Sequence, residues 1–341
     1  MKSALALIFA LPFCTGLSHA QNTTNFAHIG HVDRFDTAVN SLIPADAKIE
    51  VLCGGFEWAE GPVWVPGPSN SFGGYVLFSD IPNNAVIKWQ EGTGSSVFMK
   101  PAGYTGVADY GKEPGSNGIA LDANGQLVFC EHGDRRISTL TKSGGKMTLA
   151  DRWNGKRLNS PNDLAIRRNG DIFFTDPIYG LPQRENDAAR EIDFCGVYRL
   201  QKGGEVTLQS KELSRPNGIA FSPDEKLLYV ANSDGQDPIW RAFPVQEDGN
   251  LGTPTAFFDS SKEDRIPNGG GDGLKVDSKG NVFATGPGGV LILSPQGELL
   301  GRIVTGERIA NVGWGNDGSV LYLTSDMYLC RIKTSTKGAG F

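Results

Sequence analysis

The chain has 341 residues, of which 39% are hydrophobic and 21% charged, and its formal net charge is -6. These values are typical of a soluble globular protein with a sizeable core. The negative balance and the lack of any Lys/Arg cluster argue against nucleic acid and anionic membrane surfaces as partners. The 45 glycines favour a turn-rich, all-β chain, because glycine adopts the backbone angles that tight turns need.

The N-terminus has the pattern of a signal peptide over residues 1–20. A basic residue precedes an apolar run, and small residues follow up to Ala20. We therefore expect an exported protein, periplasmic or secreted, with an N-terminal extension over 21–48 and a single domain over 49–341. No later stretch reaches the ~20 apolar residues of a membrane-spanning helix, so no membrane association is expected.

One sequence pattern recurs six times after the extension. It consists of a polar residue often followed by Gly, an alternating apolar strand, a turn, and a second strand rich in aromatic and β-branched residues. The copies are AEGPVWVPGPSNSFGGYVLFSD, SNGIALDANGQLVFCE, PNDLAIRRNGDIFFTD, PNGIAFSPDEKLLYVAN, GDGLKVDSKGNVFATG and IANVGWGNDGSVLYLT.

The spacing of these copies is that of propeller blades. Numbered by their second residues, the copies lie at 60, 117, 162, 217, 272 and 310, which gives steps of 57, 45, 55, 55 and 38. Repeats of roughly 40 to 50 residues with loop insertions are typical of propellers. A β-sandwich also has many short strands but would not have six like units, so the sequence predicts an all-β, six-bladed β-propeller.

Four cysteines follow the signal peptide: Cys53, Cys130, Cys195 and Cys330. In an oxidising compartment they allow up to two disulfides, and the alternative is that they are buried free thiols. If KIEVLCGG supplies the outer strand of the last blade, Cys53 lies on the strand beside Cys330, and a disulfide there would lock the ring. A pairing of Cys130 with Cys195 is the weaker hypothesis.

The second residue of each quoted copy lies at the start of the strand that lines the central channel, so the six form a ring around the axis. Five of them carry a side-chain oxygen, and the residue after is Gly in four copies, which allows close approach of the backbone. We call these six positions the column. They are Glu60, Asn117, Asn162, Asn217, Asp272 and Ala310.

Two carboxylates and three amides that converge, without Cys or His, suit a hard cation bound through oxygen. Ca²⁺ is the first expectation, with Zn²⁺ or Mn²⁺ as alternatives. The ion would neutralise the repulsion between Glu60 and Asp272 and stabilise the fold. The alternative is that Asn and Asp before a strand satisfy backbone groups of a turn, but this does not explain Glu60, a poor turn former.

A second set of polar residues ends the second strand of the repeats, on the same face as the column. These residues are Asp80, Glu131, Asp176 and Asn232, and His132 follows Glu131. For most of them we expect strand-end and turn bonding. Long insertions fall on this face, which is typical of a binding site. No Gly-x-Ser-x-Gly elbow, phosphate loop or dinucleotide fingerprint occurs.

The motifs EGPVW, NSPNDLAI, RPNGIAFSPDEKLLYVAN and GDGLKVD occur in this order along nearly the whole mature chain. With them the chain resembles the gluconolactonase family, which includes senescence marker protein 30 and regucalcin, calcium-dependent propeller hydrolases that open sugar lactones. CEHGDRRI and TDPIYG make it most similar to exported bacterial members. The family's animal members have a substrate-binding Arg where this chain has Ser160. We therefore expect this chain to share the family's metal site more closely than its substrate.

The resemblance implies roles for individual residues. It implies a metal held by Glu60, Asn217 and Asp272, with Asn162 at or beside the ion and in contact with substrate, and Asp272 as the proton-transfer residue. We expect Asn117, Asn162 and His132 to bind a small lactone, and no protein partner is evident. Other metal-dependent ester or phosphotriester hydrolysis, and a non-catalytic calcium-binding propeller, remain the alternatives.

Overall fold

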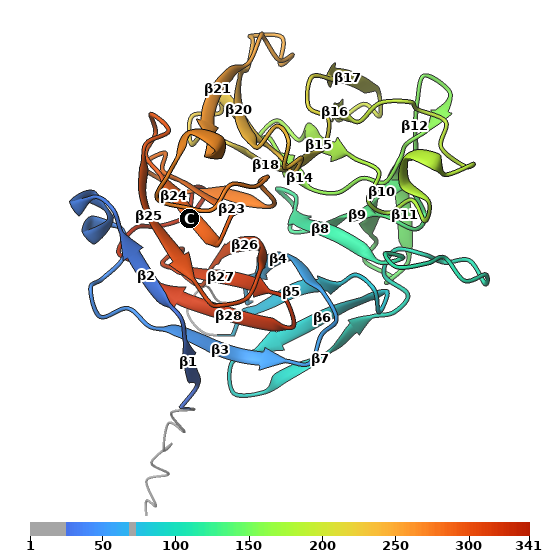
Figure 1. The fold of residues 1–341 in the computed structure, drawn as a ribbon. Coiled ribbons are helices and arrows are strands. Elements are labelled where there is room, and N and C mark those ends of the chain that lie inside the picture. Colours follow the sequence, from blue (N-terminus) through green and yellow to red (C-terminus); the bar gives the residue numbers. More distant parts are fainter. Residues whose placement is uncertain (1–24, 68–72) are drawn as a thin grey trace, which may run out of the picture.

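The computed structural model describes residues 25–67 and 73–341, and in this part of the chain strands form six sheets around a central axis (Figure 1). The predicted all-β, six-bladed propeller is thus confirmed. The predicted signal peptide lies outside the described residues. None of the helices in the described ranges has the length and apolar character needed to cross a membrane.

Each sheet runs from an inner strand at the channel to an outer strand, all pairs being antiparallel. The first two blades consist of β4 (Ala59–Val65), β5 (Tyr75–Asp80), β6 (Ala85–Gln90) and β7 (Gly94–Met99), and of β8 (Ser116–Leu121), β9 (Leu127–Glu131), β10 (Arg136–Leu140) and β11 (Lys146–Ala150). The next two consist of β14 (Leu164–Ile166), β15 (Ile172–Asp176), β16 (Gly196–Leu200) and β17 (Val206–Ser210), and of β18 (Pro216–Phe221), β19 (Leu227–Asn232), β20 (Ile239–Pro244) and β21 (Thr255–Asp259).

The last two blades are completed by strands from the N-terminus. Blade 5 consists of β22 (Leu274–Val276), β23 (Val282–Gly286), β24 (Gly289–Leu293), β25 (Leu299–Val304) and the outermost strand β2 (His31–Arg34). Blade 6 consists of β26 (Ile309–Gly315), β27 (Val320–Ser325), β28 (Tyr328–Lys333), β3 (Ile49–Gly54) and β1 (Ala27–Ile29). The remaining elements are the short pair β12 (Arg152–Trp153) and β13 (Lys156–Arg157) and the 3₁₀ turns η1 (Thr37–Ser41), η2 (Arg184–Asn186) and η3 (Ser260–Lys262).

The ring closes as the sequence predicts, with a strand from the N-terminal part of the described chain and one from its C-terminal part in the same sheet. Strand β3 pairs with β28, and Figure 1 shows the N-terminal strands β1 to β3 beside the C-terminal β25 and β28. The predicted extension over 21–48 therefore contributes two strands of its own, β1 on blade 6 and β2 on blade 5. One short segment thereby links two neighbouring blades.

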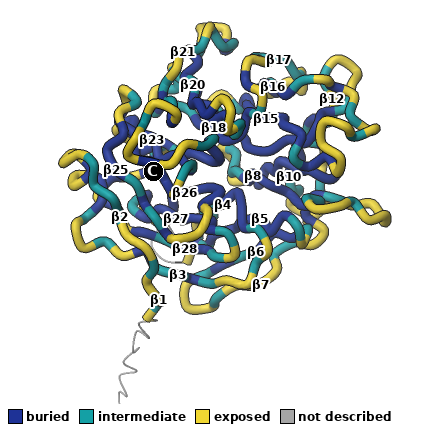
Figure 2. Tube along the Cα trace, in the orientation of Figure 1, coloured by how far each residue is buried: buried dark blue, intermediate teal, exposed yellow. Residues whose placement is uncertain are grey.

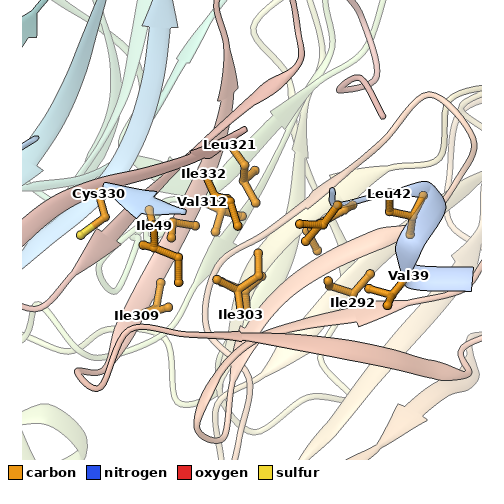
Figure 3. Packing of buried hydrophobic residues seen from close by; sticks show 14 of the residues in the cluster. Val39, Leu42, Ile49, Ile292, Ile303, Ile309, Val312, Leu321, Cys330 and Ile332 are labelled. Atoms are coloured by element: carbon orange, nitrogen blue, oxygen red, sulfur yellow. The ribbon is translucent and has the colours of Figure 1, made fainter. Parts of the chain in front are cut away.

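The core lies between the blades rather than in one central mass. Figure 2 shows the inner and middle strands buried and the outer loops exposed. Between blades 5 and 6, Val39 and Leu42 from η1 and the residues just after it pack near Ile292 and Ile303, while Ile332 lies with Val312 further along the same cluster (Figure 3). Apolar side chains from both faces of each sheet are therefore used, and this fixes the inner strands around the channel.

The predicted disulfide between Cys53 and Cys330 is wrong. The four cysteines of the described chain are all free. Their strands are neighbours as expected, but Cys53 pairs with Leu329 while Cys330 pairs with Val51, across a register shift. Cys53 joins the cluster between blades 6 and 1, whereas Cys330 belongs to the cluster between blades 5 and 6, so the two thiols lie on opposite faces of the sheet. Cys130 and Cys195 are buried in separate clusters.

Candidate functional site

Four column positions lie at the start of an inner strand, whereas Asn162 and Asp272 lie two residues before β14 and β22, and all six are buried. Strand pairing is irregular at this point in four blades, between Glu60 and Val63, Ser116 and Ile119, Pro216 and Ile219, and Ile309 and Asn311. Such bulges re-aim a side chain and interrupt the ladder, and they often accompany functional sites. The repeat therefore has a β-bulge or similar irregularity at the column position of these four blades.

Backbone hydrogen bonds between blades link neighbouring column positions. The amide of Gly118 donates to the carbonyl oxygen of Asn162 at 2.8 Å, and that of Gly218 donates to the carbonyl oxygen of Asp272 at 3.1 Å. A Cβ atom on Gly218 would lie 2.2 Å from that same oxygen, so only glycine permits this approach. The backbone carbonyl groups of Asn162 and Asp272 are thereby paired within the protein, which leaves the side chains of these residues for other partners.

Glu60 and Asp272 form a buried pair of carboxyl groups. Burial, and then the charge of Asp272, raise the pKa of Glu60 well above its usual range. Burial also raises the pKa of Asp272 to about 7, although the guanidinium of Arg308 counteracts this with Nη2 at 3.6 Å from Oδ2. Ala310 occupies the column position of the blade between them, and its methyl group offers neither carboxylate a partner.

Two amides of the column present carbonyl oxygens without partners. The side-chain oxygens of Asn117 and Asn162 are buried and accept no hydrogen bond. A buried carbonyl oxygen without a partner is costly, and a hard cation satisfies it while neutralising nearby carboxylates. Within the described ranges no three His, Cys, Asp or Glu side chains gather as a metal site, so any ion here depends on amide oxygens beside the Glu60–Asp272 pair. The donor set fits Ca²⁺.

His132 lies at this end of the channel but in a different chemical setting. Its side chain is fully buried, Nδ1 is 3.3 Å from Oε2 of Glu113, and neither ring nitrogen forms a hydrogen bond. The negative charge of Glu113 contributes to the raised pKa of Asp272, which places the His132–Glu113 pair close to the carboxylates. The predicted role of His132 in binding substrate stays a prediction.

Two residues at the ends of the second strands hold the loops that lead into the column, as expected for turn bonding. Asp80 accepts hydrogen bonds from the amides of Glu57 and Trp58. Asp176 accepts from the amides of Asn159 and Ser160, both at 2.8 Å. Each carboxylate thus fixes the segment just before a column residue.

The other two second-strand ends have different partners. The side-chain oxygen of Asn232 accepts from the amide of Arg215, two residues before Asn217. Glu131 instead forms ion pairs with Arg136 at 2.8 Å and Lys146 at 2.7 Å. These four strand-end residues bond to loops and to basic side chains of the protein. The column residues are therefore the candidates for binding a ligand in the channel.

Several residues at this mouth were not identified from the sequence. Arg308 lies over the ring of Trp58, 5.2 Å from its centroid, in addition to its contact with Asp272. Trp58 and Arg308 each stand two residues before a column position, so the repeat register contained a signal for them. Tyr179, whose hydroxyl is 2.5 Å from that of Ser233, has its pKa raised by burial and by the charge of Asp272. Tyr179 belongs to an irregular loop outside the repeat, so the repeat could not predict its position.

A large cavity of about 1410 Å³ opens at the other end of the channel. Its walls come from the far ends of the inner strands, including Leu121, Ile166, Phe221 and Trp314, and from the C-terminal Phe341. These side chains are mostly apolar and none belongs to the column. The cavity is therefore distinct from the carboxylate site.

Comparison with known proteins places the chain in a family. Residues 58–327 match the family described as the SMP-30/Gluconolactonase/LRE-like region. The chain is 36% identical over 345 residues to a gluconolactonase of Zymomonas mobilis, covering 98% of this chain and 95% of the relative. It is 31% identical to a solved gluconolactonase from Xanthomonas campestris, with a TM-score of 0.75 over 92% of this chain and 96% of that one.

A more distant solved structure shares the fold alone. It is a calcium-binding protein, regucalcin, from Agrobacterium tumefaciens, 17% identical with a TM-score of 0.65, over 85% of this chain and 94% of that one. The family match covers all six column positions, from Glu60 to Ala310. The chain belongs to the SMP-30/gluconolactonase/LRE-like family.

Proposed function

We propose that the chain is an exported, divalent-cation-dependent hydrolase that opens a sugar lactone such as glucono-1,5-lactone. The observation that carries the proposal is the buried Glu60–Asp272 pair beside the unpartnered oxygens of Asn117 and Asn162. The gluconolactonase and lactonohydrolase relatives support the reaction class. The N-terminal sequence supports export.

Glu60, Asn217 and Asp272 would hold the cation, with Asn162 at or beside it. Oxygen donors without sulfur or imidazole favour Ca²⁺, and Zn²⁺ or Mn²⁺ are the substitutes to compare. When bound, such an ion supplies Lewis-acid polarisation of a carbonyl and lowers the pKa of a coordinated water. The two carboxylates supply the charge that a divalent ion requires.

Asp272 acts as the proton carrier of the reaction. Its carboxylate accepts a proton from the attacking water while the water oxygen bonds to the lactone carbonyl carbon. When the ring C–O bond breaks, the leaving oxygen takes that proton back, and the product is an open-chain hydroxy acid. Burial raises the pKa of Asp272 to about 7 in the cation-free protein, and a bound cation would lower it, so Asp272 is in the carboxylate form that accepts a proton near neutral pH.

The remaining residues bind and orient the substrate. Asn117 and Asn162 orient oxygens of the lactone, since their side-chain amides are buried at the site. His132, held near Glu113, offers ring nitrogens to a substrate hydroxyl. Arg308 and Trp58 lie at the rim, where the guanidinium has a side-chain exposure of 70% and is free to contact an incoming oxygen.

The substrate class is tested by following acid release from glucono-1,5-lactone, a panel of other lactones and a phosphotriester, with spontaneous hydrolysis subtracted. We expect turnover of sugar lactones above that of lactones without hydroxyl groups. Preferential turnover of the phosphotriester would overturn the substrate class. Cation binding without turnover of any compound would contradict the enzymatic proposal.

A further inference from the structure

The position directly after the column has an uneven composition around the ring. Four blades have glycine there, at Gly61, Gly118, Gly218 and Gly273. The other two have Asp163 and Asn311, and both are buried at 2% exposure. A carboxylate and an amide therefore fill the channel next to the candidate cation site.

Two of the glycines make room for these side chains. A Cβ atom on Gly118 would lie 2.7 Å from Oδ1 of Asp163, and one on Gly273 would lie 2.0 Å from Cγ of Asn311. Real Cβ atoms do not approach other atoms this closely, so Asp163 and Asn311 lean against neighbouring blades at places where only glycine fits.

Asp163 and Asn311 contact each other across the channel. Nδ2 of Asn311 donates to Oδ2 of Asp163 at 3.3 Å, and backbone amides hold the remaining oxygens, Leu164 on Asp163 at 2.8 Å and Val312 on Asn311 at 2.9 Å. Nζ of Lys275 lies 3.8 Å from Oδ2 of Asp163. We call Asp163, Asn311 and Lys275 the channel plug.

The channel plug reaches both ends of the channel. On the column side, the side chain of Asn311 interacts with the carboxyl group of Glu60 and lies against Gly273, the residue after Asp272, while Asp163 directly follows Asn162 and lies against Gly118. On the far side, Lys275 lines the large cavity, with a side-chain exposure of 27%. The buried carboxylate of Asp163 thus lies between the candidate cation site and the partly exposed Lys275.

We propose that the channel plug sets the cation affinity of the column. Asp163 strengthens cation binding by its charge and positions Glu60 through Asn311, while Lys275 weakens it by neutralising part of that charge from the opposite mouth. Asp163 and Asn311 are positioning residues. This inference rests on the proposed cation site.

The two charges of the channel plug give opposite expectations, which calorimetry with Ca²⁺ alone can measure on the chelated full mature chain. Asp163→Asn removes the negative charge and should weaken Ca²⁺ binding about tenfold, because a unit charge within a buried site acts at low effective dielectric. Lys275→Met frees Asp163 from its counter-charge and should tighten binding about threefold. Lys279→Met, an exposed lysine of the same blade, is the matched control and should leave binding unchanged.

Each outcome decides the matter. Opposite shifts in the two variants, with the control at the wild-type value, support the inference. Wild-type affinity in both variants, or weaker binding in Lys275→Met, overturns it while leaving the proposed function intact. A wild type that binds neither Ca²⁺, Mn²⁺ nor Zn²⁺ overturns the proposed function and this inference together. If Asp163→Asn does not fold, Lys275→Met alone carries the test.

Discussion

Glu60 and Asp272 are the two acidic residues that determine the electrostatics of the column. Both are buried, both are acidic, and each acts on the other, so ionising the pair without a counter-ion is unfavourable. Their types and spacing were readable from the sequence, because the repeat put them in one register. The unpartnered oxygens of Asn117 and Asn162 depend on side-chain geometry, which no sequence pattern specifies.

Asp272→Asn separates proton transfer from substrate binding. The amide cannot accept the proton of the attacking water, so we expect kcat to fall by about 10²- to 10⁴-fold. The measurement is steady-state lactone hydrolysis at saturating cation, with cation occupancy checked by calorimetry. Full activity with the cation bound would contradict the assigned role of Asp272.

The difference in stability between Glu60→Gln and wild type should change sign when cation is added. In chelator at pH 8 the variant should be more stable than wild type, because a buried charge and its repulsion with Asp272 are removed. With saturating Ca²⁺ the wild type should gain about 3 kcal/mol at 100 times Kd, and the variant much less. Chemical unfolding in both conditions measures this. An equal gain in both proteins would exclude Glu60 as a cation ligand.

Asp176→Asn isolates one buried carboxyl group in the pH dependence of stability. Burial raises the pKa of Asp176 to about 7, against 3.8 in the unfolded chain. The folded state therefore binds the proton more tightly, and the contribution of Asp176 to the free energy of unfolding falls as pH rises from about 4 to 7.

The difference in unfolding free energy between wild type and Asp176→Asn, measured in chelator, isolates this contribution. We expect the wild type to lose a few kcal/mol relative to the variant between pH 4 and 7 and no more above it. A difference independent of pH would show that Asp176 has an ordinary pKa. A difference that grows in the opposite direction would show that its pKa is depressed.

At the scale of elements, the inner strands were predictable and the N-terminal strands were not. The inner strand, turn and second strand recur with a near-constant offset, and this periodicity located the column. Strands β1 and β2 have three and four residues, mostly exposed or half-buried, and no repeat to align with. Their pairing with β3 and β25 depends on tertiary contacts of η1 with blade 5, such as Val39 beside Ile292.

Gly218→Ala tests whether close approach of two inner strands positions the column. The added Cβ would lie 2.2 Å from the carbonyl oxygen of Asp272, so Asp272 or β18 must shift. We expect a loss of about 2 to 4 kcal/mol in stability together with weaker Ca²⁺ binding. Gly235→Ala is the matched control, because its Cβ would meet nothing within 4 Å. Equal melting temperatures and Ca²⁺ affinities for the two variants would contradict this account of the inter-blade contact.

At the scale of the whole molecule, the repeat predicted the number of blades and the closure of the ring. It did not predict on which face of a sheet a given side chain lies. Cys53 and Cys330 lie on neighbouring strands as predicted, but a register shift separates them to opposite faces. A shift of one residue exchanges the two faces of a strand, and spacing alone does not reveal it. The polar filling of the channel by Asp163 and Asn311 likewise emerges only when six blades are assembled.

The central claim is that a divalent cation at Glu60 and Asp272 drives lactone hydrolysis, and a Ca²⁺ titration of the chelated protein tests it most directly. Glucono-1,5-lactone hydrolysis and calorimetric binding should be followed on the same preparation, with Glu60→Gln as the control. We predict that activity is lost on chelation and returns with a half-saturation that matches the measured Kd. Full activity in chelator, or activity that returns equally in Glu60→Gln, would contradict the account.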